Sequence, residues 1–187
     1  MLDKDKILAN AKKYFETAEP FITEELTAFL GLDFVSAPAS TSKNLNNAFE
    51  GGLIDHLLRT TKFAIIINGA LPASLKLTKE EIIKVCLLYQ IGKAHAFVPN
   101  TSDWHQKNGK FYDFKNDMIS MSIGERSAYY AQAFGVQLSE TEFQAIMNHD
   151  KDDSDKQAKF FTSNLGTLLR QANEWAIIEE KILNKWV

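Results

Sequence analysis

The sequence predicts an all-α domain, a bundle of helices with one small β-hairpin insertion. Three observations support this class. Apolar residues recur at helical spacing along most of the chain, two Ser/Thr–x–x–Glu capping boxes begin helical segments, and one short segment between Trp104 and Phe114 breaks the helical pattern. With 45% hydrophobic residues and 13 Phe among 187 residues, the chain has enough apolar material for a core.

Two helices are expected at the start of the chain. Residues 3–18 carry apolar side chains at helical spacing, including Ile7 and Phe15. Pro20 suits the first turn of a second helix because its fixed backbone angle matches that of a helix, and Gly31 is expected to end this helix.

A polar segment follows and marks the one candidate boundary. Residues 32–47 are rich in Ser, Ala, Thr and Asn and are expected to form the longest loop, a linker or a lid. We therefore divide the chain into residues 1–48, which pack on the core as N-terminal helices and a loop, and residues 49–187, which form the main helical domain.

The main domain is expected to contain five helices. Capping boxes at Thr78 to Glu81 and at Ser139 to Glu142 begin two of them, because each hydroxyl and the Glu three residues later satisfy free backbone N–H groups reciprocally. The expected helices cover residues 53–68, 78–92, 122–134, a segment after 139, and 164–185.

The hairpin is predicted around an Asn-Gly turn. Asn108 and Gly109 lie between Trp104 and the aromatic residues Phe111, Tyr112 and Phe114. Aromatic residues around such a turn favour packing of the hairpin on its own domain, and stacking on a nucleic-acid base is the alternative.

Composition excludes several classes of protein. A net charge of −3 shows no basic excess for nucleic-acid binding. No stretch approaches the ~18 apolar residues of a membrane span, and the first residues lack the apolar core of a secretion signal, so we expect a cytoplasmic protein without a membrane partner. Cys86, the one cysteine, lies in an apolar run and is expected to be a small buried side chain.

Three segments together resemble the HD-domain phosphohydrolase superfamily. Gly51-Gly52-Leu53-Ile54-Asp55-His56 is similar to its first motif, in which a glycine-preceded helix supplies a metal-binding His. Leu87-Leu88-Tyr89-Gln90-Ile91-Gly92-Lys93 is similar to its second, with Tyr89 and Gln90 in place of the His-Asp pair. Leu168–Glu174 resembles its last motif, with Asn173 in place of Asp. The resemblance covers about residues 50–180 and implies an HD-like helical bundle.

The substitutions remove most of the chemistry that the resemblance implies. An HD site surrounds a divalent cation with two His and two Asp, and the cation polarises a phosphoryl oxygen and activates water. Of these four positions, His56 alone keeps its residue type. Tyr89 is a neutral phenol at pH 7, and Gln90 and Asn173 have lost the negative charge. We therefore expect no catalytic residues, no metal and no other cofactor at this degenerate site.

Other residues offer alternatives to this interpretation. His149 and Asp150 resemble a later segment that supplies ligands in some HD families, so His56, His149 and Asp150 are the candidates for a rearranged divalent-metal site. Lys93 and Arg126 could hold a phosphate by charge-assisted hydrogen bonds. Alternatively, Lys93 could interact only with the negative C-terminal end of the helix dipole.

Two further features are expected to be ordinary surface groups. The acidic run from residue 150 to 156 lacks the Gly and Glu that an EF-hand calcium loop requires, so a solvated loop is expected. His95 and His105 have no His partner at helical spacing, and hydrogen-bonded or surface roles are expected for both.

The predicted function is that of a catalytically impaired HD-like protein that binds a nucleotide-like or phosphorylated ligand or a protein partner. One alternative is an active metal-dependent phosphohydrolase with a rearranged site. Another is a structural or assembly subunit, including one from a phage, since degenerate HD-like proteins of this length occur in phage genomes.

Overall fold

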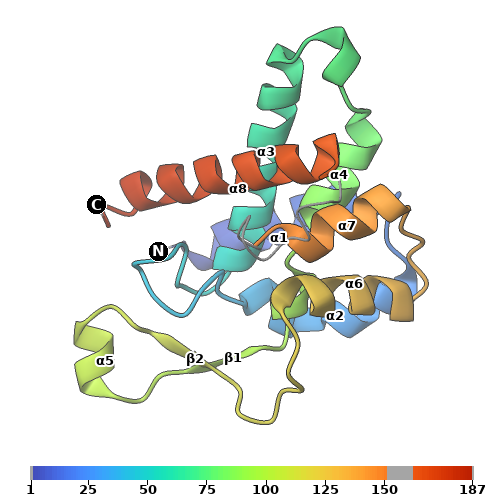
Figure 1. Ribbon diagram of the computed structural model, residues 1–187. Helices are drawn as coiled ribbons and strands as arrows, with labels where there is room; N and C mark the ends of the chain where they lie inside the picture. The colour runs from blue at the N-terminus through green and yellow to red at the C-terminus, as the bar shows by residue number, and fades with distance from the viewer. Residues whose placement is uncertain (1, 151–161, 187) are drawn as a thin grey trace.

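The computed structural model describes residues 2–150 and 162–186, which form eight α-helices, two short 3₁₀-helices and one two-stranded antiparallel sheet (Figure 1). The helical class with a small antiparallel sheet is therefore confirmed. None of the helices in the described residues is long and apolar enough to cross a bilayer. The elements are, in chain order, α1 (Lys4–Ala18), α2 (Glu24–Ser36), α3 (Gly52–Ala70), η1 (Ala73–Leu75), α4 (Lys79–Leu88), η2 (Ile91–Lys93), β1 (Phe97–Pro99), α5 (Asp103–Lys107), β2 (Tyr112–Phe114), α6 (Ile123–Ala133), α7 (Glu140–Asn148) and α8 (Asn164–Leu183).

Helix α3 is the centre of the arrangement. It packs against α8, α4, α1 and α2, and α8 crosses it with its C-terminal end extending away from the other helices (Figure 1). Helix α6 packs on η2 and α7, and α7 packs in turn on α8 and α4. Side chains from α3, the end of α4 and α8 can therefore meet in the interior.

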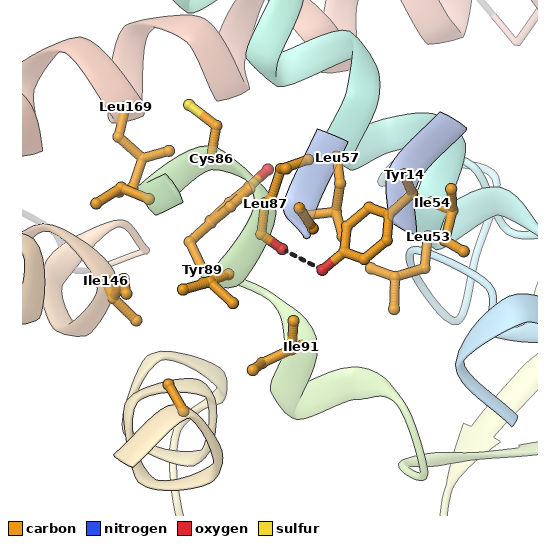
Figure 2. Close-up of a cluster of buried hydrophobic side chains, with 14 of the residues drawn as sticks. Tyr14, Leu53, Ile54, Leu57, Cys86, Leu87, Tyr89, Ile91, Ile146 and Leu169 are labelled. Carbon is orange, nitrogen blue, oxygen red and sulfur yellow. Dashed lines mark hydrogen bonds between the residues drawn. The ribbon is translucent and has the colours of Figure 1, made fainter. Parts of the chain in front are cut away.

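The core joins the N-terminal helices to the rest of the chain. Tyr14 of α1 is fully buried, and its hydroxyl donates a hydrogen bond of 2.8 Å to the main-chain oxygen of Leu87 in α4 (Figure 2). Phe34 of α2 is also fully buried and packs edge-on against Tyr14. Cys86 lies in this core as predicted, and burial raises the pKa of its thiol. Helices α1 and α2 thus share one core with α3 and α4.

Capping boxes fix the starts of three helices. In each, the hydroxyl accepts from the N–H three residues later and the Glu carboxylate accepts from the capping residue's own N–H. The two predicted boxes are confirmed, and the third begins α6. The pairs are Thr78 and Glu81, Ser122 and Glu125, and Ser139 and Glu142.

The predicted break of the second helix at Gly31 is present, but a short helical segment that was not predicted follows it within α2. Gly31 has φ +52°, a left-handed conformation that glycine adopts without a side-chain clash, so it kinks the helix, and helical structure resumes as far as Ser36. Leu32, just after the kink, is 83% exposed.

The loop that follows is correspondingly shorter than predicted and lies against the core. It begins at Ala37, and Phe49 near its end is buried. The Ala39 N–H donates to the main-chain oxygen of Asn47, which closes the loop on itself. Small side chains such as Ala37 and Ala39 permit this close packing, so the loop is neither a free linker nor an exposed lid.

The hairpin exists, but its predicted turn is wrong. The strands are β1 and β2, with Phe97 opposite Phe114, and the connection contains α5. Ser102 caps α5 by accepting from the His105 N–H, and Gly109, with φ +82°, lies just beyond the end of this helix rather than in a two-residue turn. The local caps therefore override the Asn-Gly turn signal.

The hairpin aromatics divide between packed and exposed positions. Phe114 stacks on Phe97 with ring centroids 4.9 Å apart, and Tyr112 lies at 6.4 Å from the same ring. Trp104, in α5, is 69% exposed. The strands thus pack on each other, while Trp104 remains on the surface.

Two glycines of the motifs, Gly52 and Gly92, lie where another backbone approaches closely. A Cβ on Gly52 would lie 2.3 Å from the Asn47 main-chain oxygen, and one on Gly92 would lie 2.8 Å from the Ile123 oxygen. Helix α4 ends at Leu88 instead of continuing to Gly92 as predicted, and η2 then turns the chain beneath α6. These glycines allow backbones to approach closely.

Candidate functional site

Three of the four motif positions meet in the interior. His56 lies on α3, Tyr89 just after α4 and Asn173 on α8. The Tyr89 hydroxyl oxygen lies 2.6 Å from His56 Nε2 and donates to Asn173 Oδ1 at 3.0 Å. His56 Nε2 lies 3.0 Å from the same Asn173 oxygen. His56 and Tyr89 are fully buried, so three helices converge on one polar cluster.

Two members of this cluster were missed from the sequence. Glu180 Oε1 lies 2.8 Å from His56 Nδ1, and both side chains are fully buried. Thr60 Oγ1 lies 3.1 Å from the Tyr89 hydroxyl. Helical spacing could have found both, because Glu180 is two turns beyond Asn173 and Thr60 is one turn beyond His56. We call His56, Thr60, Tyr89, Asn173 and Glu180 the buried polar junction.

The hydrogen bonds of the junction have a defined direction at two points. A carboxylate only accepts, so His56 donates from Nδ1 to Glu180 and turns Nε2 toward Tyr89. Burial raises the pKa of the Tyr89 phenol well above its usual value of 10.0, so this hydroxyl keeps its proton at pH 7 and donates. The members of the junction therefore bond mainly to one another, but Glu180 Oε2 is buried without a hydrogen-bond partner among the described residues.

An ion pair extends the junction toward the surface. Arg59 Nε lies 3.6 Å from Glu180 Oε1, and the same guanidinium pairs with Asp55 at 3.0 Å and with Glu179. Asn47 and Asn10 donate to the two Asp55 oxygens, at 2.9 and 3.2 Å. Glu180 is thus positioned between an imidazole and a guanidinium.

The side chains of the junction do not supply the ligands that a divalent cation needs. The groups around Tyr89 are one imidazole nitrogen, a protonated phenol and an amide. The one buried carboxylate, Glu180, is hydrogen-bonded to the opposite side of the imidazole ring. Structural and catalytic zinc sites use thiolate, imidazole and carboxylate ligands, and magnesium prefers carboxylate oxygens. In the described residues, no group of three or more His, Cys, Asp or Glu side chains is arranged to hold a metal ion.

Comparison of the chain with protein-family models, curated proteins and solved structures found no match.

The structure gathers only part of the alternative set formed by His56, His149 and Asp150. His149 is buried, packs edge-on against Tyr89 with ring centroids 4.8 Å apart, and donates from Nδ1 to the Ile146 oxygen at 2.8 Å. Burial lowers the His149 pKa to about 4, so the ring is neutral at pH 7. Asp150 is exposed, and the acidic residues after it, 151 to 156, lie outside the described residues.

Gln90, the fourth motif position, faces a different partner. Its side chain is 6% exposed and its Oε1 accepts from Lys93 Nζ at 2.8 Å. Lys93 Nζ also donates to the main-chain oxygen of Ala39, in the loop after α2. Burial lowers the pKa of Lys93 to about 8. Lys93 therefore anchors the loop to η2.

Arg126, the second predicted phosphate-binding residue, is likewise used internally. It is 8% exposed, and Nη2 donates to the main-chain oxygen of Ile119. Its Cβ lies where α6 passes over Gly92. The guanidinium thus secures the segment before α6, although its Nε has no hydrogen-bond partner among the described residues.

One open cleft lies apart from the junction. It has a volume of about 420 Å³ and lies between the end of α2, the following loop, and the hairpin. Its charged or titratable groups are Asp33, Glu50, His95, Tyr112 and Lys115. His95 Nδ1 lies 3.0 Å from Asp33 Oδ2 and Nε2 lies 2.9 Å from the Phe29 oxygen. None of His56, Tyr89, Gln90 or Asn173 lines this cleft.

Of the remaining histidines, His95 and His105 both have hydrogen-bond partners, as expected. His105 Nδ1 lies 3.3 Å from Asn100 Nδ2 in the hairpin connection. Neither ring belongs to the junction. The junction itself offers hydrogen bonding and charge pairing between helices, with neither an exposed nucleophile nor an exposed acid–base pair among its five members.

Proposed function

We propose that this chain is a non-catalytic HD-like protein that acts by binding a protein partner, with its ancestral cation site converted into a helix-joining hydrogen-bond network. The motif pattern supports the HD assignment through His56 and the Ile91-Gly92-Lys93 segment. The His56–Glu180 pair supports it independently, because metal-bound histidines commonly donate their second ring N–H to a carboxylate.

The position of the Tyr89 hydroxyl carries the proposal. This oxygen lies within 3.1 Å of polar atoms of His56, Asn173 and Thr60, and it is fully buried. A cation between positions 56 and 173 would have to displace this neutral hydroxyl and would gain no carboxylate in exchange. Hydrolysis by the route of the superfamily, with its metal-activated water, is therefore not expected.

The use of Lys93 and Arg126 favours a protein partner over a phosphorylated ligand. Arg126 is buried and Lys93 is half-buried, and both donate to main-chain oxygens, so both cationic groups already form hydrogen bonds within the fold. A phosphate would have to break these hydrogen bonds to be bound. Exposed apolar side chains, by contrast, are available on several helices.

An activity screen tests the catalytic part of the proposal. The purified protein is assayed for phosphatase, phosphodiesterase and nucleotidase turnover with Mn²⁺, Fe²⁺, Ni²⁺, Zn²⁺ and Mg²⁺, beside a His56→Ala control. We expect no turnover above the control. Metal-dependent turnover that His56→Ala or His149→Ala abolishes would contradict the proposal and favour the rearranged site.

Restoring the lost ligands tests the HD assignment. In the triple variant Tyr89→His, Gln90→Asp and Asn173→Asp, we expect a gain in affinity for Mn²⁺ or Ni²⁺ measured by calorimetry, because Glu180 already orients His56. Tyr89→Phe with Asn173→Ala is the matched control that adds no ligand. A folded triple variant with no gain over this control would contradict the assignment.

A further inference from the structure

The outer face of α8 carries an apolar stripe with no partner in the described residues. Trp175, Ile178 and Ile182 are 54%, 47% and 59% exposed, and their spacing of three and four residues places them in one line along the helix. Contiguous exposed apolar side chains of this size usually mark an interaction site. Helix α8 also extends away from the other helices at its C-terminal end (Figure 1).

Two charged residues run along one edge of the stripe. Glu174 and Lys181 are seven residues, or about 10.5 Å, apart on the same side of α8. Neither side chain forms an ion pair with another described residue, and each is at least partly exposed. On the other edge, Glu179 is already paired with Arg59 and Lys62.

From this pattern we infer that the chain forms an antiparallel homodimer through α8. A twofold axis across the stripe places Glu174 of each copy beside Lys181 of the second copy, which makes two ion pairs. In the same register, Trp175 of each copy lies against Ile178 of the other. A parallel alignment would instead place Lys181 and Glu174 of one copy beside Glu179 of the other, which is already paired with Arg59 and Lys62. The antiparallel arrangement is therefore the one that gives both Glu174 and Lys181 a partner of opposite charge.

The second copy of the chain is the protein partner in the binding role proposed above, and the dimer rests on that proposed function only for this role. A monomeric chain could still lack catalytic activity, and an active enzyme could still dimerise. Failure of the dimer and failure of the non-catalytic function can therefore be distinguished. One helix from each copy supplies less surface than the standard interface of about 1,600 Å², so we expect reversible association with a Kd of the order of micromolar.

Sedimentation velocity tests the dimer over protein concentrations from about 1 to about 200 µM, a range that brackets this affinity. The mass is expected to rise with concentration toward twice the 21.1 kDa of one chain. Ile178→Glu should keep the protein monomeric throughout, whereas Leu32→Glu, at a more exposed apolar site on α2, should leave dimerisation unchanged. A wild-type chain that stays monomeric, or an Ile178→Glu variant that still dimerises, would overturn the inference.

A charge exchange tests the antiparallel register. Glu174→Lys alone and Lys181→Glu alone should each weaken dimerisation about tenfold, because each creates two like-charge contacts across the axis. The double variant Glu174→Lys with Lys181→Glu should recover the wild-type Kd. Circular dichroism checks that all three variants remain helical. A double variant that dimerises no better than the single variants would contradict this register.

Discussion

The two faces of α8 differ in how their least typical side chains are accommodated. The inner face is mainly apolar but also carries the fully buried Glu180 and the half-buried Asn173, while the outer face exposes Trp175 and Ile178. Polar groups can be buried at the inner face because each of them finds a partner on α3 or beside α4. The outer face has no such partner within the described residues. Burial in this protein is therefore decided by pairing as well as by hydropathy.

The inner and outer faces should also differ sharply in their response to mutation. At the inner face, removing one partner leaves another polar group buried without a hydrogen bond, which costs more than the bond itself contributes. At the outer face, a substitution in the monomer only changes contact with water.

Removal of the buried carboxylate should have the largest effect. Glu180→Ala leaves His56 Nδ1 without its acceptor and Arg59 Nε without its nearest charge, so we expect a loss of about 3–5 kcal/mol in the free energy of unfolding. Glu179→Ala, at the adjacent and partly exposed position, should lose no more than about 1 kcal/mol. Urea denaturation measures both, and similar losses for the two variants would show that burial of Glu180 contributes little.

Lowering the pH should reduce the free energy of unfolding because His149 is buried in its neutral form. Burial lowers its pKa from 6.5 to about 4, so between these values the unfolded chain binds a proton that the folded chain does not. The free energy of unfolding should therefore fall as the pH drops from about 6.5 to about 4, by up to about 3 kcal/mol, and this contribution should be constant above pH 6.5.

The variant His149→Gln provides the control for this pH dependence. Its unfolding free energy, measured in urea at pH steps between 4 and 7, should vary less steeply than that of the wild type. Curves with the same slope would mean that His149 is protonated equally in the folded and unfolded chains.

Loss of the Tyr89 hydroxyl should have a smaller effect than loss of Glu180. Tyr89→Phe keeps the ring in contact with His149 but removes the group that donates to Asn173 and lies beside His56 and Thr60. We expect a loss of about 1–3 kcal/mol, because neutral buried groups are left unsatisfied. Thermal unfolding followed by circular dichroism would detect this, and an unchanged or higher melting temperature would contradict the network.

The outer face should show the smallest effect. Ile178→Ala, measured at a concentration low enough to keep the chain monomeric, should change the free energy of unfolding by no more than about 0.5 kcal/mol. The same substitution should weaken dimerisation when the concentration is raised. A large loss of monomer stability would show that Ile178 packs within its own chain.

Much of the fold was predictable because helical periodicity and caps are local signals. The predicted helices at 3–18 and 164–185 correspond closely to α1 and α8, and both predicted capping boxes are present. The break at Gly31 was also predicted, but the helical segment after it was not. The turn of the hairpin was predicted wrongly, since Ser102 caps a short helix where a turn was expected. There a neighbouring cap outweighs the Asn-Gly signal.

The part of the site that the sequence predicted is the part that the motifs contain. The motifs include His56, Tyr89 and Asn173, and these side chains meet in the structure. Glu180 was overlooked because a Glu in an amphipathic helix normally faces water, and only the crossing of α8 over α3 buries it. Lys93 and Arg126 donate to the main-chain oxygens of Ala39 and Ile119. A sequence motif cannot predict such contacts, because every residue carries a main-chain oxygen.

The proposal that the junction binds no cation depends on the hydrogen bonds between the Tyr89 hydroxyl and its neighbours His56, Asn173 and Thr60. Metal content and thermal unfolding of the purified wild-type protein test it together, before and after EDTA treatment and with added Mn²⁺, Ni²⁺ or Zn²⁺. We predict substoichiometric metal and a melting temperature that neither EDTA nor added metal changes, because a ligand stabilises only the state that binds it. One firmly bound metal ion per chain, with a melting temperature that falls on its removal and is lost from His56→Ala, would contradict the account.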